Sequence, residues 1–459
     1  MTLVPNDRPP LPDGPFLVVG LARSGLAVAR TLRRLGAQVR AVDAGPIPEE
    51  ARSALEADGV EVRAPDAGVD LVPGTRTVVK SPGVPKQVPV IRAAHDRGLL
   101  VVGELEIAWR LLPNDVIAVT GSNGKTTTVE LIGHVHREAG LPVAVAGNVG
   151  TALSSLPGTL DPAATIVCEA SSFQLEDTEL FAPEAAVLLN ITPDHLDRHG
   201  TMAAYTQAKL QVFARQGNDA VAVAPLGLGI EDLGGCARRV CFGDGAGAEL
   251  ATRAGHLWWD EQALMPVSAI RLRGDHNRHN AMAAAAVTLA RGIDPGAVRA
   301  GLETFAGVAH RLEEVARARG VLFVNDSKAT NVDAAVTGLR SFDAGVHAIL
   351  GGRGHADDLA PLVTAIRERA RAVYLIGEAA DELRPALTGA GVPVTDSGDL
   401  ERAVDAAGRA ASPGEVVLLS PAYKSFDQYP DFEARGEHFR ALARRSRRGS
   451  DRGPGAAGA

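Results

Sequence analysis

Short apolar runs alternate with amphipathic helical patterns along almost the whole chain. Such alternation predicts parallel sheets with crossover helices, because two parallel strands need a long connection between them. In the first part of the chain, this pattern predicts strands at 16–20, 38–43, 77–80 and 99–102. We therefore expect an α/β fold from the outset.

The same alternation resumes after Pro113-Asn114-Asp115 and again near Gly307-Val308-Ala309. The central part predicts strands at 116–119, 143–146, 165–168, 185–191 and 220–224, followed by short strands and loops over 227–265. Residues 280–291 are rich in alanine, which has the highest helix propensity, so they predict a helix. The last part predicts strands at 321–325, 346–350, 372–376 and 416–419.

These patterns predict three domains, at 1–112, 113–308 and 309–446. A length of 459 residues agrees with about three domains of ordinary size. Residues 447–459 are basic and then rich in glycine and alanine, which predicts a disordered tail.

Composition excludes several classes of protein. The net charge of −8 argues against a nucleic-acid binder, which normally carries a basic face. The 3 cysteines have no metal-ligand spacing and are typical of reduced cytosolic thiols. The N-terminus has no apolar signal core, and no stretch is long and apolar enough to span a membrane. We expect a cytoplasmic protein that binds no nucleic acid and does not insert into membranes.

A glycine loop at 120–127, with the sequence T-G-S-N-G-K-T-T, lies between a predicted strand and a helical pattern. Gly121 and Gly124 let backbone N–H groups point at an anion at the positive end of that helix. Lys125 would reach the outer phosphates, and Thr126 would offer its hydroxyl to Mg²⁺. The loop therefore predicts a nucleoside triphosphate site, with a chance glycine turn as the alternative. Val119 departs from the longer pattern G-x-x-x-x-G-K-[ST], which has glycine there.

A second glycine turn, Gly20 to Gly25, approximates G-x-G-x-x-G, with Asp43 at the end of the next strand. Alone, it suggests a Rossmann-like domain and an NAD-dependent oxidoreductase. However, Ala22 replaces the middle glycine, and its methyl group hinders close approach of a pyrophosphate. The open alternatives are another nucleotide ligand or a plain tight turn.

Three further segments carry polar residues whose role the pattern alone leaves open. Glu169 ends a strand, and strand ends in such a sheet converge on the phosphate loop, where a carboxylate can hold Mg²⁺. The loop 190–199 contains His195 among acids and could equally be a solvated turn. Lys209 lies on a predicted helix, where a lysine is usually a surface charge.

Taken together, nine motifs resemble those of the Mur ligases, in the same order. They are T-G-S-N-G-K-T-T, G-N-V-G, E-A-S-S-F-Q-L-E, N-I-T-P-D-H-L-D-R-H, A-K-L, H-N-R-H-N, H-R-L-E, N-D-S-K-A-T-N and S-P-A-Y-K-S-F-D-Q. The resemblance covers the chain from Pro15 to the tail and is greatest to the members that join D-glutamate to UDP-N-acetylmuramoyl-L-alanine. It implies a Rossmann-like N-terminal domain, a P-loop ATPase-like central parallel sheet and a Rossmann-like C-terminal domain.

The resemblance also implies an activity. The family uses ATP to convert a carboxylate into an acyl phosphate, which the amine of an incoming amino acid then attacks. Here the implied substrates are ATP, UDP-N-acetylmuramoyl-L-alanine and D-glutamate, in peptidoglycan precursor synthesis. Two Mg²⁺ sites and a monomer are also implied.

The resemblance also implies contacts and roles for individual residues. ATP contacts are implied for Gly121, Asn123, Gly124, Lys125, Thr126, Thr127, Asn280, Arg311 and Asp326. Metal ligands are implied for Thr126, Glu169, His195 and Lys209, the last as a carbamate formed with CO₂, and catalytic roles for Lys125, His195 and Lys209. The UDP-substrate is implied to contact Arg23, Ser24, Asp43, Asn148 and Ser171. The glutamate is implied to contact Lys328, Thr330, His355, Lys424, Ser425 and Phe432.

The chain departs from the family at the glutamate site. His355 stands where the family usually has a lysine, and P-A-Y-K-S at 421–425 replaces the usual P-A-C-A-S. A histidine with an ordinary pKa of about 6.5 is only partly cationic at neutral pH. Our hypothesis is that Lys424 or Arg353 supplies the missing charge, and the alternative is that His355 suffices. A further departure is Ala44, where the family often offers UDP a threonine hydroxyl.

The departures leave alternatives to the D-glutamate ligase. A ligase of the same fold could add L-glutamate or another amino acid. An NAD-dependent oxidoreductase built on the first glycine turn would leave the phosphate loop unexplained. A non-catalytic nucleotide-binding module would have no reason to retain Lys125, Glu169, His195 and Lys209.

Overall fold

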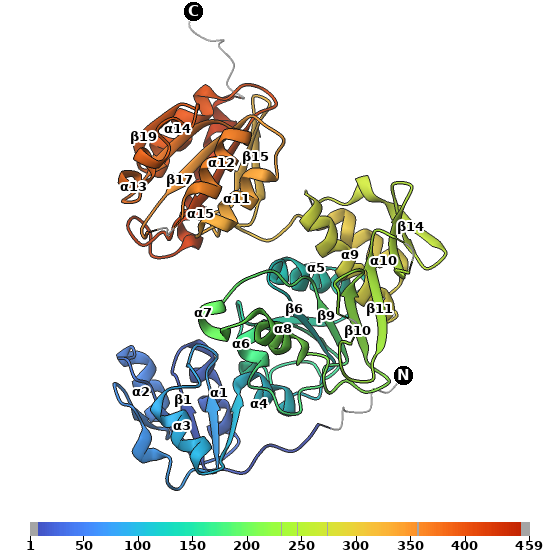
Figure 1. The fold of residues 1–459 in the computed structure, drawn as a ribbon, viewed down its shortest axis with the longest axis vertical. Coiled ribbons are helices and arrows are strands. Elements are labelled where there is room, and N and C mark those ends of the chain that lie inside the picture. The colour runs from blue at the N-terminus through green and yellow to red at the C-terminus, as the bar shows by residue number, and fades with distance from the viewer. Residues whose placement is uncertain (1–7, 231, 246, 273, 356–357, 451–459) are drawn as a thin grey trace, which may run out of the picture. The chain divides into compact units, whose positions relative to one another are not determined.

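The computed structural model describes residues 8–230, 232–245, 247–272, 274–355 and 358–450 (Figure 1). The chain divides into two compact units. The first holds the described residues up to Arg271 and those from Asp275 to Phe305. The second begins at Ala306 and also includes Leu272 and Gly274. The described residues of the predicted domains 1–112 and 113–308 thus lie together in the first unit, apart from Leu272, Gly274 and residues 306–308.

The first unit begins with a five-stranded parallel sheet of order β3-β2-β1-β4-β5. Its strands are β1 (Phe16–Val19), β2 (Val39–Val42), β3 (Glu61–Arg63), β4 (Thr77–Lys80) and β5 (Leu100–Gly103). The connections form the helices α1 (Arg23–Arg34), α2 (Glu49–Ala57), α3 (Pro89–Asp96) and α4 (Glu104–Leu111), with a 3₁₀ turn at Val69–Leu71. This strand order confirms the predicted Rossmann-like domain.

The second sheet of this unit has the order β14-β13-β12-β11-β10-β9-β6-β8-β7. Its parallel part comprises β6 (Val116–Thr120), β7 (Val143–Gly147), β8 (Thr165–Glu169), β9 (Ala185–Leu188), β10 (Val221–Pro225), β11 (Arg238–Gly243) and β12 (Leu250–Arg253). Two antiparallel strands, β13 (His256–Trp259) and β14 (Gln262–Pro266), extend its edge. The helices are α5 (Lys125–Glu138), α6 (Ser172–Leu175), α7 (Leu196–His199), α8 (Met202–Leu210), α9 (Asp275–Ala290) and α10 (Pro295–Thr304). Two 3₁₀ turns lie at Leu153–Ser155 and Val267–Ala269.

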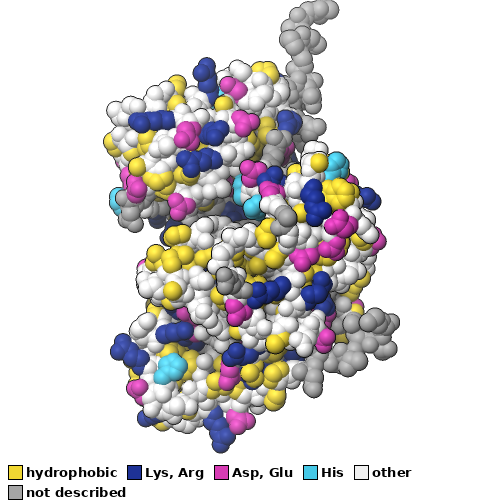
Figure 2. Space-filling model, turned by 45° about the vertical axis from the view of Figure 1, so that its right-hand side comes forward, with side chains coloured by type: hydrophobic (Ala, Val, Ile, Leu, Met, Phe, Trp, Pro, Cys, Tyr) yellow, Lys and Arg dark blue, Asp and Glu magenta, His cyan; other side chains and the backbone are white. Residues whose placement is uncertain are grey.

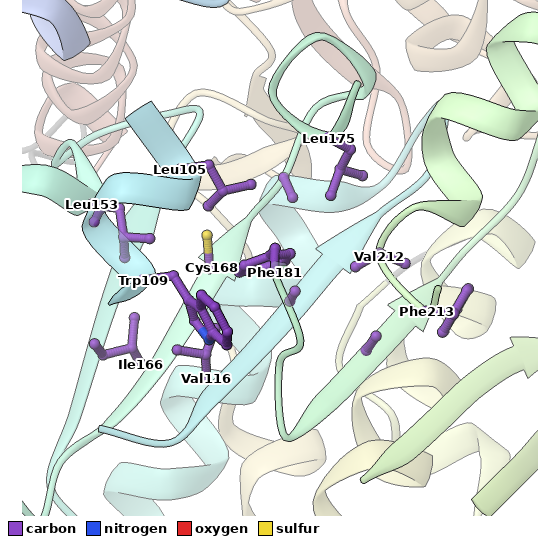
Figure 3. Close-up of a cluster of buried hydrophobic side chains, with 14 of the residues drawn as sticks. Leu105, Trp109, Val116, Leu153, Ile166, Cys168, Leu175, Phe181, Val212 and Phe213 are labelled. Atoms are coloured by element: carbon purple, nitrogen blue, oxygen red, sulfur yellow. The ribbon is translucent and has the colours of Figure 1, made fainter. Parts of the chain in front are cut away.

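A buried apolar cluster joins the two sheets of the first unit (Figure 3). Trp109 of α4 meets Phe181 edge-on, with ring centroids 5.7 Å apart. The same cluster includes Val116 of β6 and Ile166 of β8, so the helix that ends the first sheet packs against the second. Burying such aromatic side chains contributes about 1.5–3 kcal/mol each. The phosphate loop that follows β6 is thereby held on a rigid frame.

The second unit is a six-stranded sheet of order β15-β16-β20-β17-β18-β19, in which only β15 pairs antiparallel among the described strands. Its strands are β15 (Glu313–Ala318), β16 (Val321–Asn325), β17 (Val346–Gly351), β18 (Ala370–Ile376), β19 (Val394–Gly398) and β20 (Val416–Ala422). The helices are α11 (Val332–Arg340), α12 (Ala360–Arg369), α13 (Ala380–Ala386), α14 (Leu400–Ala410) and α15 (Phe432–Ser450). Because α15 continues to Ser450, residues 447–450 of the predicted disordered tail are helical here, and 451–459 lie outside the described residues.

Basic and acidic side chains lie interspersed on the face of the molecule drawn in Figure 2. None of the described helices is long and apolar enough to cross a membrane.

Candidate functional site

The phosphate loop connects β6 to α5, and two of its residues have positive φ angles, which favour glycine. Gly121 has a φ of +154° and Gly124 a φ of +86°. A Cβ placed on Gly124 would lie 2.2 Å from Oδ1 of Asn280. Asn280 is a buried residue of α9, so the predicted ATP contact of that helix lies directly against the loop. Thr127, another predicted contact, follows in the first turn of α5.

Two lysines converge on one carbonyl of this loop. The Nζ atoms of Lys125 and Lys209 donate to the Gly121 oxygen, at 2.8 Å and 2.7 Å respectively. Lys125 also donates to the Ser122 oxygen at 2.9 Å. Lys209, from α8, is only 2% exposed. Burial above all, and then the charge of Lys125, lower the pKa of Lys209 to about 7, although Asp194 acts in the opposite direction.

An oxygen-rich cluster lies at the end of β8. The Thr126 hydroxyl donates to Oε2 of Glu169 at 2.8 Å, and the Asn148 amide donates to Oε1 at 3.0 Å. Glu169 is 2% exposed, and Thr126 is also buried. The strand ends of this sheet therefore bring a hydroxyl and a carboxylate to the loop, as the sequence predicts for a Mg²⁺ site.

The loop 190–199 lies against the phosphate loop. Asn190 accepts from the Asn123 N–H at 2.9 Å and donates to the Asn123 carbonyl at 3.1 Å. His195 precedes α7 with a φ of +53°, and its side chain is about half exposed at 48%. Its ring centroid lies 4.8 Å from that of Phe173. The imidazole Nε2 lies 3.5 Å from Oδ2 of Asp194, whose side chain is also about half exposed.

Tyr205 connects these parts of the site. Its hydroxyl lies 3.0 Å from the Ser122 hydroxyl, and its ring centroid lies 4.5 Å from Nζ of Lys209. Tyr205 is 1% exposed and lies one helical turn before Lys209 on α8. The aromatic face thus shields the Lys209 amine from water while it stabilises the protonated form.

The glycine turn of the first sheet is held by side chains from two neighbouring strands. Asp43 accepts from the Leu21 N–H at 2.6 Å and from the Gly45 N–H at 2.9 Å. Ser81, after β4, donates its hydroxyl to the Gly20 carbonyl at 2.7 Å. A Cβ on Gly25 would lie 1.8 Å from the same carbonyl, so only glycine fits there. Asp43 therefore shapes the turn in this structure.

The other predicted contacts of the UDP-substrate lie on both sheets of the first unit. Arg23 opens α1 and donates to the Asn148 carbonyl at 2.9 Å, and Ser24 follows it. Ser171 caps α6 in a reciprocal capping box with Gln174. The Arg23 contact links the first glycine turn to the residue that also binds Glu169.

In the second unit, Asp326 is buried after β16. Its carboxylate accepts from the Ser420 hydroxyl at 2.7 Å and from the Leu312 N–H at 3.2 Å. Burial raises the pKa of Asp326 to about 7, and these two hydrogen bonds and the charge of Arg311 oppose the rise. His310 and Leu312, on either side of Arg311, have φ values of +62° and +46°.

Two of the predicted glutamate contacts, Lys328 and Phe432, lie near each other in the second unit. Nζ of Lys328 lies 5.2 Å from the Phe432 ring centroid, and the Phe432 carbonyl accepts from Ser327 at 2.8 Å. Thr330 is half-buried, and Ser425 is buried.

The charged residues nearby differ in how far they are already paired. Arg353 makes a two-pronged ion pair with Glu378, at 3.0 Å and 2.7 Å. His355, 77% exposed, lies 2.9 Å from Glu382. The Lys424 carbonyl accepts from the Arg353 N–H at 2.7 Å, and Lys424 is exposed.

Comparisons with known proteins match nearly the whole chain. The Mur ligase MurD-like N-terminal domain matches residues 15–103, the Mur ligase middle domain 119–288, and the glutamate ligase domain of Mur ligases 310–423. A relative from Anaeromyxobacter dehalogenans is 42% identical over 459 residues, covering 93% of this chain and 96% of its own. One from Acidobacterium capsulatum is 40% identical, covering 93% and 95%. The chain belongs to the Mur ligase family. Both relatives are named UDP-N-acetylmuramoylalanine–D-glutamate ligase.

Solved structures of other Mur ligases share the fold. UDP-N-acetylmuramate-alanine ligase MurC from Thermotoga maritima superposes with a TM-score of 0.59 at 19% identity, covering 94% of this chain and 99% of its own. The MurF ligase of the same organism, solved in complex with ADP, gives a TM-score of 0.55 at 16% identity, covering 90% and 95%. The Mur ligase assignment of the first sheet removes the basis for an NAD-dependent oxidoreductase.

The residues present fit a magnesium nucleotide in a Mur ligase. Mg²⁺ prefers oxygen ligands and usually takes one or two carboxylates together with substrate phosphates. Thr126 and Glu169 supply such oxygens at the mouth of the phosphate loop. Over the described part of the chain, no three His, Cys, Asp or Glu side chains form a ready metal cage. The donor set therefore suits an ion that is also held by phosphates.

The structure brings one group of predicted residues together by direct contacts, all within the first unit: Gly121, Gly124, Lys125, Thr126, Asn148, Glu169, Lys209 and Asn280. Sequence reasoning about this Mur ligase missed three residues that contact the predicted ones. Tyr205 packs on Lys209, Asn190 binds the phosphate loop at Asn123, and Ser420 donates to Asp326. Tyr205 could have been found from its position one helical turn before Lys209. Asn190 could have been found as the polar residue that ends a buried strand.

Proposed function

We propose that this protein uses ATP to join D-glutamate to UDP-N-acetylmuramoyl-L-alanine in peptidoglycan precursor synthesis. The observation that carries the proposal is the buried Lys209 amine, 2.7 Å from the carbonyl that also binds Lys125. A ligase of this kind needs a neutral amine beside its phosphate loop if that amine is to become a carbamate. The names of relatives at 40% and 42% identity support the same substrates.

The proposed reaction has two steps. A carboxylate oxygen of the muramoyl-alanine attacks the γ-phosphorus of ATP, and ADP leaves. The amine of glutamate then attacks the acyl carbon, loses a proton and expels phosphate. Both steps crowd anions together, so cationic groups must offset their repulsion. Lys125 is positioned for this role because its ammonium group already lies on the loop that would hold the phosphates.

Magnesium, when bound, would neutralise phosphate charge and polarise the transferred group. Thr126 and Glu169 would hold one ion, and His195 with carbamylated Lys209 a second. Carbamylation adds CO₂ to a neutral amine and releases a proton, which converts a cation into a carboxylate-like ligand. The lowered pKa of Lys209, about 7, supplies that neutral amine near physiological pH.

The first glycine turn is proposed to hold the UDP moiety, through Arg23, Ser24 and Asp43, with Asn148 and Ser171 toward the muramoyl end. Arg311 and Asp326 are proposed to contact the ATP phosphates and ribose. The protein is proposed to act in the cytoplasm as a monomer.

Glutamate is proposed to bind the second unit through Lys328, Thr330, Ser425 and Phe432. Of the two candidates for the missing charge, Lys424 is favoured because its exposed ammonium group has no ion pair within the described residues. Arg353 is already neutralised by Glu378.

We expect Lys424→Ala to raise the KM for glutamate by about tenfold, because one charge-assisted contact to a carboxylate is lost. The KM for ATP should remain within about twofold, and Arg353→Ala should change the glutamate KM much less. Steady-state phosphate release at varied glutamate measures both constants. An unchanged glutamate KM in both variants would leave His355 as the cation of this site.

Phosphate release with UDP-N-acetylmuramoyl-L-alanine and ATP tests the proposed function directly. D-Glutamate is expected to give the highest kcat/KM among D-glutamate, L-glutamate and other amino acids. A preference for L-glutamate would assign the altered site to a different amino acid. ATP binding without phosphate release would support a non-catalytic nucleotide-binding module.

A further inference from the structure

Arg198 lies at the centre of a contact path between the two sheets of the first unit. It belongs to α7, the single helical turn that follows His195. Its guanidinium Nη2 donates to Oε1 of Glu176 at 2.8 Å and to the Val84 carbonyl at 3.0 Å. The side chain is 13% exposed, and that of Glu176 is 11% exposed. A largely buried arginine with such partners is a fixed structural contact rather than a solvated surface charge.

One side of Arg198 faces the first glycine turn. Val84 belongs to the segment after β4, in which Ser81 donates its hydroxyl to the Gly20 carbonyl at 2.7 Å. The Val84 carbonyl also accepts from Lys80 at 2.9 Å, and Lys80 forms a buried ion pair with Asp177 at 2.7 Å. The segment that Arg198 holds is therefore the same one that shapes the turn proposed for UDP.

Arg198 also contacts Phe173, an aromatic neighbour of His195. The guanidinium carbon lies 4.9 Å from the Phe173 ring centroid, and the ring centroids of His195 and His199 lie 4.8 Å and 5.4 Å from the same point. Phe173 is nearer to the half-exposed His195 ring than Tyr205, whose ring centroid lies 6.4 Å from it. A planar cation stacked on Phe173 fixes where the Phe173 ring lies.

We infer that Arg198 is a positioning residue that sets the place of His195 relative to the turn proposed to bind UDP, acting through Phe173. The inference rests on the proposed function, in which His195 is a metal ligand. It extends that function because Arg198 would couple metal binding at His195 to the position of the segment after β4. Arg198 does not itself touch the reacting atoms.

The test uses Arg198→Lys, which keeps a positive charge near Glu176 but loses the planar group that spans Phe173 and the Val84 carbonyl. A second variant, Phe173→Leu, removes the ring and leaves Arg198 in place. Lys86→Ala is the matched control, because Lys86 also pairs with Glu176, at 3.5 Å, but is 45% exposed. Full-length protein is used throughout, and thermal unfolding and binding of a non-hydrolysable ATP analogue report whether each variant is folded.

We expect kcat for phosphate release to fall by about 10- to 100-fold in Arg198→Lys and in Phe173→Leu, because small misplacements of reacting groups are costly. The Mg²⁺ concentration for half-maximal rate and the KM for the UDP-substrate should rise, while the KM for ATP stays within about twofold. The double variant should be no worse than the poorer single variant, since both residues act on His195 through one contact.

The outcomes separate the two proposals. If the natural protein releases no phosphate with its full set of substrates, the proposed function fails. If it is active, and folded Arg198→Lys and Phe173→Leu keep its kcat and Mg²⁺ dependence, the positioning role is overturned. The positioning role would also be overturned if the fall in kcat of the double variant equalled the product of the two single falls, because the two residues would then act independently.

Discussion

Replacing Lys209 with methionine is expected to abolish ligase activity and, at the same time, to stabilise the fold. Activity should fall at least about a hundredfold, since a buried electrostatic group of the site is lost. Stability should rise because the natural protein must bury an amine whose charged form is disfavoured at 2% exposure. Phosphate release and thermal unfolding measure the two effects on the same preparations.

The stabilisation by Lys209→Met should be larger at pH 6 than at pH 9. The pKa of Lys209 is about 7 in the folded protein, below its ordinary value of 10.5. At pH 6 both folded and unfolded chains carry the charge, so the natural protein bears the whole cost of burying it. As pH rises above 7 the folded protein releases the proton, and the cost declines toward zero near the unfolded pKa.

Lys86→Met is the control for this effect, because Lys86 is 45% exposed and should yield no comparable gain. Equal melting temperatures for Lys209→Met and the natural protein at pH 6 would show that the amine is not buried as described. In addition, the natural protein should incorporate ¹³C-labelled CO₂ at Lys209 more fully at pH 8 than at pH 6, since only the neutral amine reacts.

The second large effect is expected for Gly124→Ala in the phosphate loop. A methyl group there would lie 2.2 Å from Oδ1 of Asn280 and would also strain a backbone with φ +86°. Either the loop or Asn280 must move, and both are proposed to contact ATP. The KM for ATP should rise by about a hundredfold, because small displacements at a phosphate site are costly.

Gly140→Ala provides the matched comparison. Gly140 follows the other end of the same helix, α5, with a φ of +68° and open space around its missing Cβ. It carries the left-handed strain of about 1–2 kcal/mol without any clash. Both variants should therefore lose stability, but only Gly124→Ala should lose ATP affinity. Similar KM values for ATP in the two variants would mean that the loop tolerates the methyl group.

The strands that sequence reasoning predicted best are fully buried ones. The predicted segments 77–80 and 321–325 coincide with β4 and β16, in which every residue is buried. Adjacent apolar residues such as Val78-Val79 and Leu322-Phe323-Val324 are typical of strands buried on both faces. The strand β3 was missed because Glu61 and Arg63 give it no apolar run, and it lies at a sheet edge. Edge strands keep one side exposed, and their patterns resemble loops.

The site was less predictable than the fold. The position of Lys209 on a helix indicated a surface charge, and only the family resemblance singled it out. Its burial depends on α8 turning toward the phosphate loop, a tertiary contact that local sequence does not encode. The Arg198 contacts were equally hidden, because residues 84, 173 and 198 are far apart in the chain. Strand ends were the exception, since sheet topology alone predicted that Glu169 and the loop would meet.

The interface between the two sheets of the first unit decides where this chain can be cut. A fragment that ended near residue 112 would lose the contact between Trp109 and Phe181. It would also leave the buried Lys80 without its ion-pair partner Asp177. An uncompensated buried charge of this kind costs about 3–5 kcal/mol, a large share of a domain's stability. By contrast, the border between Phe305 and Ala306 separates two bodies that each keep their own core. Fragments of this enzyme for ligand screening should therefore be divided between Phe305 and Ala306, and not at the predicted domain border at residue 112.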